Sequence, residues 1–218
     1  MTTIAIIGAG PGLGAAAARR FGREGFSVAL VARGRDRLDR LAADLAADGV
    51  RARGYPADVR DRAALAGALD SAAAELGAVE VLQYSPLPSR AFLRPVLETT
   101  VADLAAAVEF SVLGTATAVG RVLPGMRESG RGTILLVNGA SAATPNGAVA
   151  GTSTAFAGES AYGAMLHDAL APENIHVAQL IIPGAIGGGD PLFAPEALAE
   201  RLWTLHAEHG PYRTTVGE

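Results

Sequence analysis

Residues 3–14 read Thr-Ile-Ala-Ile-Ile-Gly-Ala-Gly-Pro-Gly-Leu-Gly, and this stretch decides the fold. The segment Thr3–Ile7 is rich in β-branched side chains and predicts a buried strand. Glycines end that strand, and the alanine-rich residues that follow predict a helix from Gly12 to about Glu24. The chain therefore opens with a strand, a glycine turn and a helix.

The same alternation of strand and helix continues to the end of the chain. Strands are expected at 27–32, 50–55, 79–83, 133–137, 176–182 and 212–216. Helices are expected at 35–48, 61–76, 101–127, 151–170 and 196–209. Strands separated by helices of this length indicate crossover connections and a parallel sheet covered on both faces. We therefore expect one α/β domain over residues 1–218, a three-layer Rossmann fold with a doubly wound parallel sheet of about seven strands.

The composition excludes several classes of function. The 218 residues carry a net charge of −4, which disfavours nucleic acid or an acidic membrane as partner. No apolar run reaches the roughly 18 residues needed to span a bilayer, and no N-terminal signal precedes the first strand. There is no cysteine, which suits a cytoplasmic protein, and the histidines and carboxylates show no metal-ligand spacing. All 18 basic residues are arginine.

The glycine turn has the chemistry of a dinucleotide site. Gly8 permits a tight turn out of the strand, Gly12 lets the backbone approach a pyrophosphate, and Gly14 lets the helix pack close to the sheet. The helix N-terminus offers free N–H groups and a partial positive charge to the phosphates. The alternative is a glycine-rich turn that holds no ligand, but the position between a first strand and an amphipathic helix favours the ligand.

The end of the second strand bears on which dinucleotide is bound. It reads Val31-Ala32-Arg33, whereas an NAD site usually has an acidic residue here for the ribose 2′-hydroxyl. A guanidinium at this place suits a 2′-phosphate, which it binds with two hydrogen bonds. The sequence therefore predicts NADP(H), with NAD(H) and a merely solvated arginine as the alternatives.

These residues resemble the short-chain dehydrogenase/reductase family over nearly the whole chain. The resemblance rests on Gly8-xxx-Gly12-Leu13-Gly14, on Asp58-Val59 after the third strand, on Leu123–Met126 with Gly132, and on Pro183-Gly184. The predicted cofactor-binding residues are Gly8, Gly12, Leu13, Gly14, Arg33, Asp58, Val59, Ser85, Pro86, Pro183, Gly184 and Ile186.

The resemblance implies hydride transfer between a nicotinamide and a carbonyl or alcohol, with an asparagine, a serine, a tyrosine and a lysine as catalytic residues. Alignment through Pro172 and Asn174–Val177 places the tyrosine on Thr152 and the lysine on Phe156. The serine, thirteen residues before the tyrosine, falls on Gly139, and the asparagine falls on Ser111 in the segment Phe110–Gly114. No shift of the alignment restores the lysine, because the chain has none. A free phenol needs a nearby cation to act near neutral pH, so the family's standard mechanism is not expected here.

Four other polar residues are candidates for catalysis: Tyr84, Ser85, Asn138 and Ser141. They follow the fourth and fifth strands, at the edge where ligands bind in open α/β sheets. Each has an alternative role in holding its loop. Thr152–Thr154 are expected to cap the helix that they begin.

Three functions are compatible with this sequence. The first is an NADP(H)-dependent oxidoreductase with a non-standard active site, acting on an unknown small carbonyl or alcohol. The second is a non-catalytic NADP(H) sensor or subunit, and the third is a non-redox enzyme that reuses the cleft. The helices at 101–127 and 151–170 are rich in small residues and pair across a two-fold axis in the family, so a homodimer or homotetramer is expected.

Overall fold

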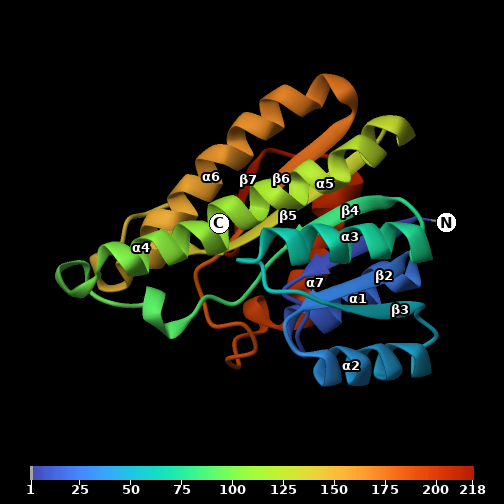
Figure 1. Ribbon diagram of the computed structural model, residues 1–218, viewed down its shortest axis with the longest axis horizontal. Coiled ribbons are helices and arrows are strands. Elements are labelled where there is room, and N and C mark those ends of the chain that lie inside the picture. Colours follow the sequence, from blue (N-terminus) through green and yellow to red (C-terminus); the bar gives the residue numbers. More distant parts are fainter. Residues whose placement is uncertain (1) are drawn as a thin grey trace.

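The computed structural model describes residues 2–218 and shows one parallel sheet between two layers of helices (Figure 1). The strands are β1 (Thr3–Ile7), β2 (Ser27–Ala32), β3 (Ala52–Pro56), β4 (Val79–Tyr84), β5 (Gly132–Gly139), β6 (Ile175–Ile182) and β7 (Arg213–Thr215). The helices are α1 (Leu13–Arg23), α2 (Arg35–Ala47), α3 (Arg62–Leu76), α4 (Val101–Val108), α5 (Gly114–Ser129), α6 (Ala150–Leu170) and α7 (Pro195–Glu208). The strand order is β3-β2-β1-β4-β5-β6-β7, with all pairs parallel, so the predicted seven-stranded doubly wound sheet is confirmed.

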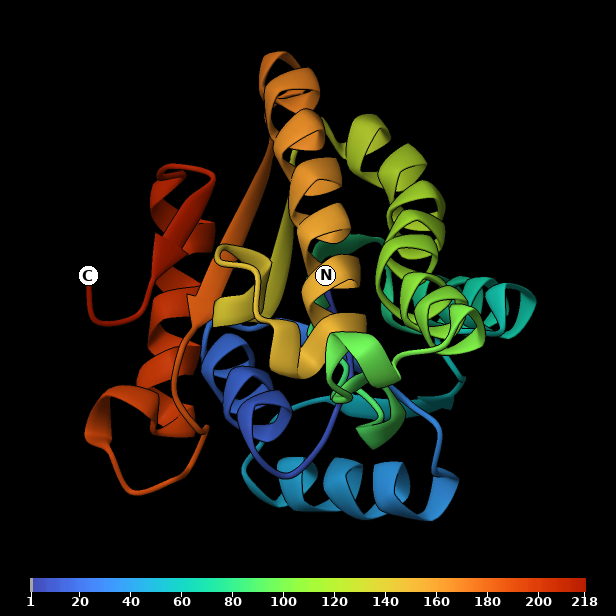
Figure 2. The ribbon, with the colours of Figure 1, turned by 90° about the vertical axis from the view of Figure 1, so that its left-hand side faces the viewer.

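The two helical layers explain why the central strands are apolar throughout. Helices α1, α2 and α7 cover one face of the sheet, and α3, α4, α5 and α6 cover the other (Figure 2). In β1, Ile4 and Ile6 belong to the core under α1, α2 and α7, whereas Ala5 and Ile7 belong to the core under α3 to α6. Successive side chains of a strand point to opposite faces, so a strand covered on both faces buries every residue, as β1 does.

Helices α4 and α5 form one nearly continuous rod. Between them, Glu109–Leu113 make a π-helical turn. A capping box of Thr100 and Asp103 starts the rod, and Gly130, with φ +65°, ends it. By length and composition alone, Val101–Ser129 is long and apolar enough to cross a membrane, with a window of mean hydropathy 1.3, but charged residues interrupt it and it holds no uninterrupted apolar run of 18 residues. Only 28% of that window is buried, so much of its surface faces outward.

The start of α6 differs from the sequence prediction. A short 3₁₀ turn at Gly147–Val149 leads into the helix, which begins at Ala150 rather than at Gly151. The Thr152 hydroxyl donates to the Val149 carbonyl at 3.0 Å, and the Ser153 hydroxyl accepts from the Asn146 amide at 2.9 Å. Because the helix begins earlier, these residues lie in its first turn, and the prediction that they cap it is wrong.

Candidate cofactor-binding site

The glycine turn is shaped by its contact with the loop after β4. Gly8 has φ +94°, a conformation that favours glycine. Its amide donates to the Val31 carbonyl at 2.9 Å. A Cβ on Gly8 would meet the Ser85 carbonyl oxygen and would lie 2.6 Å from Pro86 Cα. Gly8 therefore allows the ends of β1 and β4 to close on each other.

The other two glycines of the motif differ in what surrounds them. A Cβ on Gly12 would find no atom of the described residues within 4 Å, so the backbone there is open to a ligand. A Cβ on Gly14 would lie 3.0 Å from Ala9 Cα. Gly14 thus allows α1 to pack against the turn itself, whereas the sequence suggested close packing against the sheet.

The N-terminus of α1 has free donors and no competing acid. No side chain caps this end, and the first turn of α1 contains no acidic residue. The first backbone donations run from Ala15 to the Gly10 carbonyl at 2.9 Å and from Ala16 to the Gly12 carbonyl at 3.1 Å. The amides of Gly12, Leu13 and Gly14 are therefore left without a backbone acceptor among the described residues, and with the helix dipole they form the arrangement that binds phosphate.

The ends of β2 and β3 lie side by side next to this turn. The Ala57 amide donates to the Ala32 carbonyl at 3.0 Å, which brings Asp58 and Val59 close to the end of β2. Arg33 is exposed and forms no ion pair within residues 2–218. Its guanidinium is therefore available to an anionic ligand at the place where the sequence predicted one.

Beyond β6, the chain forms a small closed loop. The Phe193 ring lies against Gly184, where a Cβ would come within 2.6 Å of Phe193 Cζ. The Gly187 amide donates to the Phe193 carbonyl at 3.0 Å, and this bond closes the segment. Pro183 and Ile186 are both exposed on this loop. The predicted nicotinamide-side residues therefore lie at the carboxyl edge of the sheet.

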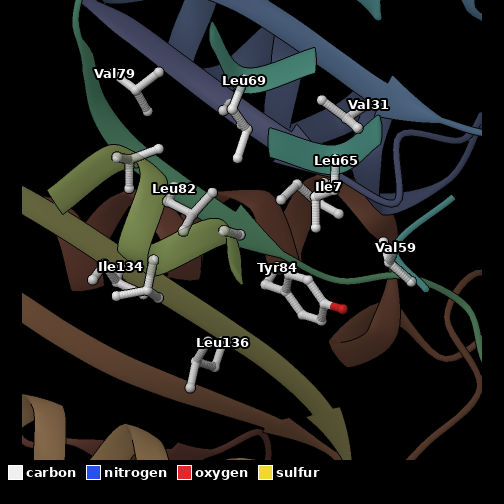
Figure 3. Close-up of a cluster of buried hydrophobic side chains, with 14 of the residues drawn as sticks. Ile7, Val31, Val59, Leu65, Leu69, Val79, Leu82, Tyr84, Ile134 and Leu136 are labelled. Carbon is white, nitrogen blue, oxygen red and sulfur yellow. The ribbon is translucent and has the colours of Figure 1, made fainter. Parts of the chain in front are cut away.

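Tyr84 does not face a cleft, so its proposed role as a donor to substrate is wrong. The side chain is 1% exposed, and its hydroxyl donates to the Phe110 carbonyl. Figure 3 shows the ring among aliphatic side chains that include Leu82 and Leu136. Alternation along β4 gives the reason, because Tyr84 shares the face of Leu82, which contributes to the same core. Burial raises its pKa well above 10.

The remaining catalytic candidates differ in how free their polar groups are. The Ser85 hydroxyl accepts from Gln83 Nε2 at 2.9 Å and donates to the Ile7 carbonyl at 3.3 Å. Asn138 is buried, and its Oδ1 accepts from Gln179 Nε2 at 2.8 Å. Ser141 is half-buried, in the turn after β5, and forms no side-chain hydrogen bond within residues 2–218. Of the four, Ser141 is the one whose side chain has no structural partner there.

The sequence alignment assigned the family's catalytic positions to Ser111, Gly139, Thr152 and Phe156. Gly139 ends β5, while Ser111, Thr152 and Phe156 are buried. Phe156 belongs to the core between the sheet and the α3–α6 layer. The Ser111 hydroxyl donates to Glu159 and the Thr152 hydroxyl donates to the Val149 carbonyl, so both hydroxyls are engaged within the protein.

The sequence reasoning missed Glu159, a buried carboxyl on the inner face of α6. It is 1% exposed, and the Ser111 hydroxyl donates to its Oε2. Burial raises the pKa of Glu159 to about 7, while the side chains of Ser111, Asn138 and Thr115 favour its charged form. The signal was its spacing: Glu159 follows Phe156 by three residues and Thr152 by seven, which places all three on one helix face.

Comparison with known proteins identifies the family. Residues 2–189 match the family model described as short chain dehydrogenase. The chain belongs to this family. No three His, Cys, Asp or Glu side chains within residues 2–218 are arranged to hold a metal ion.

Relatives of this short-chain dehydrogenase are oxidoreductases. A protein from Mycobacterium tuberculosis named as an uncharacterized oxidoreductase is 33% identical over 141 residues, which are 62% of this chain. The chain spans 40% of the length of that relative. A short-chain dehydrogenase structure from Rhodopseudomonas palustris has 26% identity and a TM-score of 0.88, and the match covers 100% of this chain and 98% of the other.

Several similar structures contain a nicotinamide cofactor, and one of these holds NADP. It is a metagenomic short-chain oxidoreductase in complex with NADP, with a TM-score of 0.86 and 20% identity, and the match covers 99% of this chain and 96% of the other. At 20% sequence identity, this similarity shows a shared fold and no more. In that oxidoreductase the same fold holds NADP.

Proposed function

We propose that this short-chain dehydrogenase binds NADP(H) and acts as an oxidoreductase with a non-standard active site on a small carbonyl or alcohol. The observation that carries the proposal is the open turn at Gly12, next to the free N-terminus of α1 and close to the exposed Arg33. The absence of cysteine supports a cytoplasmic location.

The residues present fit a dinucleotide. The Gly8–Gly14 turn offers backbone amides and open space for a pyrophosphate, and Arg33 offers a guanidinium for the 2′-phosphate. Asp58 and Val59 would border the adenine, and Pro183–Ile186 with Ser85 and Pro86 would border the nicotinamide. When bound, the nicotinamide supplies the hydride chemistry.

Ser141 is the side chain best suited to a substrate oxygen. Its hydroxyl has no side-chain hydrogen bond to any described residue, and it lies in the turn after β5. An unactivated hydroxyl is a poor acid, so we assign it the role of holding and orienting a substrate oxygen. Hydrogen-bond donors aimed at developing negative charge contribute to catalysis without transferring a proton.

A non-catalytic NADP(H) sensor or subunit is the second candidate. It is favoured by the burial of Ser111, Thr152 and Phe156 and by the use of the Tyr84 hydroxyl inside the core. Under this alternative, the cofactor half of the site is retained and the reactive half serves packing.

A fluorescence titration with NADPH tests the proposal, followed by a panel of small aldehydes and ketones monitored by loss of NADPH absorbance. We expect saturable binding and turnover of at least one carbonyl. Ser141→Ala should lower the turnover rate by about tenfold or more with an unchanged Kd for NADPH, while Ser71→Ala, on the distant α3, should change neither. No binding at millimolar NADPH would reject both candidates, and binding without turnover favours the sensor.

Replacing Arg33 should change the preference between cofactors. Arg33→Ala removes a charge-assisted hydrogen bond to the 2′-phosphate, so we expect NADPH to bind about tenfold or more weakly while the Kd for NADH is unchanged. Arg23→Ala, which removes the same charge at the far end of α1, is the control. Equal weakening of NADPH and NADH by Arg33→Ala contradicts the assignment.

We also propose a homodimer or homotetramer through the outer faces of α4, α5 and α6. The rod Val101–Ser129 is apolar and little buried, and Met165 on α6 is 63% exposed. Such a surface is stabilised when a second copy covers it. Sedimentation should give a multiple of the 22.1 kDa chain mass. Met165→Glu should shift this toward the monomer, whereas Leu192→Glu, in the loop after β6, should not.

A further inference from the structure

Glu159 is buried without a compensating charge. The Ser111 hydroxyl donates to Oε2, while Oε1 has no hydrogen-bond partner within residues 2–218. The chain has no lysine, and no ion pair joins Glu159 to an arginine of the described residues. An isolated carboxylate in such a place is strongly disfavoured, and such a group is retained in its neutral form.

A second buried polar atom lies beside the Glu159 carboxyl. Thr115 Oγ1 is also buried without a partner, and Thr115 is one of the polar groups that act on the Glu159 carboxyl. A neutral carboxylic acid has one O–H donor in addition to its acceptor oxygens. The Thr115 hydroxyl can therefore bond to Oε1 in either charge state, as acceptor from the neutral acid or as donor to the carboxylate, while Oε2 keeps the bond from Ser111. The neutral form is favoured by the burial of the carboxyl without a cation.

Besides α5, which contributes Thr115, four elements meet at this carboxyl. Glu159 comes from α6, and Ser111 comes from the π-helical turn between α4 and α5. Asn138, on β5, and Tyr84, on β4, are close enough for Asn138 to lower the pKa of Glu159 and for Glu159 to raise the pKa of Tyr84. Tyr84 and Asn138 come just before the two loops that form the ligand edge.

The other titratable groups around Glu159 keep their charge state near neutral pH. Burial raises the pKa of Tyr84 on β4 well above 10 and that of Tyr212, before β7, to about 12, so both stay neutral. Arg213 on β7 is directed to Gln179 Oε1 at 2.9 Å and to the Ser160 hydroxyl. Glu159 is therefore the group in this cluster that titrates in the physiological range.

We propose that Glu159 is a positioning residue for the ligand edge and that it works as a neutral carboxylic acid joining α6, the π-helical turn, β4 and β5. That a ligand binds at this edge of the sheet rests on the proposed function. Ionisation places a negative charge among Tyr84, Ser111 and Asn138. The loops that follow β4 and β5 then loosen, including Ser85-Pro86, which closes on Gly8.

Thermal unfolding reports the charge of the Glu159 carboxyl when Glu159→Gln and the unaltered protein are compared at each pH. The folded-state pKa is raised from 4.5 to about 7, so this contribution to stability is complete below pH 4.5 and lost as pH rises through 7. We expect the Tm of Glu159→Gln, relative to the unaltered protein, to rise by about 4–8 °C between pH 5.5 and 8.5. Glu128→Gln, at an exposed position on α5, should show no such change.

Hydrogen exchange of the protein without cofactor reports whether Glu159 holds the loops after β4 and β5 in place. At pH 8.5, backbone amides in 84–92 and 138–146 should exchange at least threefold more slowly in Glu159→Gln than in the unaltered protein, and amides of α2 should not differ. NADPH should also lose affinity for the unaltered protein, relative to Glu159→Gln, as pH rises from 5.5 to 8.5.

The outcomes separate this inference from the proposed function. A pH-independent Tm difference shows that the carboxyl is ionised throughout and overturns the inference. A pH-dependent Tm with unchanged exchange in both loops overturns the positioning role. Absence of NADPH binding in both proteins rejects the proposed function, while Tm and exchange still decide the role of Glu159.

Discussion

Gly8→Ala should destabilise the fold by about 2–5 kcal/mol and remove measurable NADPH binding. The φ of +94° is costly for alanine, and the new Cβ would lie 2.6 Å from Pro86 Cα and would also meet the Ser85 carbonyl. The clash involves backbone on both sides, which has no rotamer to relieve it. Urea unfolding measures the loss of stability, and fluorescence titration measures the loss of binding.

Two neighbouring glycines provide the controls. Gly10→Ala would place its Cβ no nearer than 4.0 Å to the Gly8 carbonyl oxygen, so stability should change by less than about 0.5 kcal/mol. Gly12→Ala meets no atom of the described residues within 4 Å, so it should cost only the penalty of alanine at a helix N-cap, about 1 kcal/mol, and weaken NADPH binding. Equal stabilities for Gly8→Ala and Gly12→Ala would contradict the contact between the turn and Pro86.

The sequence predicts the fold well because its signals are local. Thr3–Ile7 and the other apolar runs indicate strands by composition, and the helices between them are long enough to force parallel crossovers. The glycine turn can also be predicted from the sequence. The reason why position 8 requires glycine cannot, because the residues that crowd Gly8 come from the loop after β4, more than 70 positions away.

The surroundings of the polar residues considered for catalysis were predicted less well, because burial of a polar group depends on distant partners. Tyr84 follows β4 at the right edge, but its hydroxyl enters the core through space left by Gly114 and finds the Phe110 carbonyl. Glu159 is tolerated because Ser111 and Thr115 approach from another helix. The alternation along β4 and the helix spacing on α6 indicated that Tyr84 and Glu159 share faces with core residues. The residue types alone suggested a polar cleft.

Gly114→Ala should destabilise the protein by about 1–3 kcal/mol, although alanine is the better helix former by about 1 kcal/mol. Gly114 is the first residue of α5, and a Cβ there would meet the Tyr84 hydroxyl and lie 3.2 Å from the Val59 carbonyl oxygen. In Figure 3 the Tyr84 oxygen points toward the side where Val59 lies. Gly120→Ala, in the same helix with no atom within 4 Å, should instead stabilise the protein by up to about 1 kcal/mol.

A double-mutant cycle with Tyr84→Phe separates the clash from a general effect on the helix. Tyr84→Phe alone leaves the buried Phe110 carbonyl without its donor and should cost about 1–3 kcal/mol. In Gly114→Ala with Tyr84→Phe the new methyl group takes the space of the lost hydroxyl, so the combined cost should be at least 1 kcal/mol less than the sum. Additive costs, measured by urea unfolding, would show that Gly114 serves the π-helical turn rather than the tyrosine. The buried tyrosine then packs independently of the glycine that faces it.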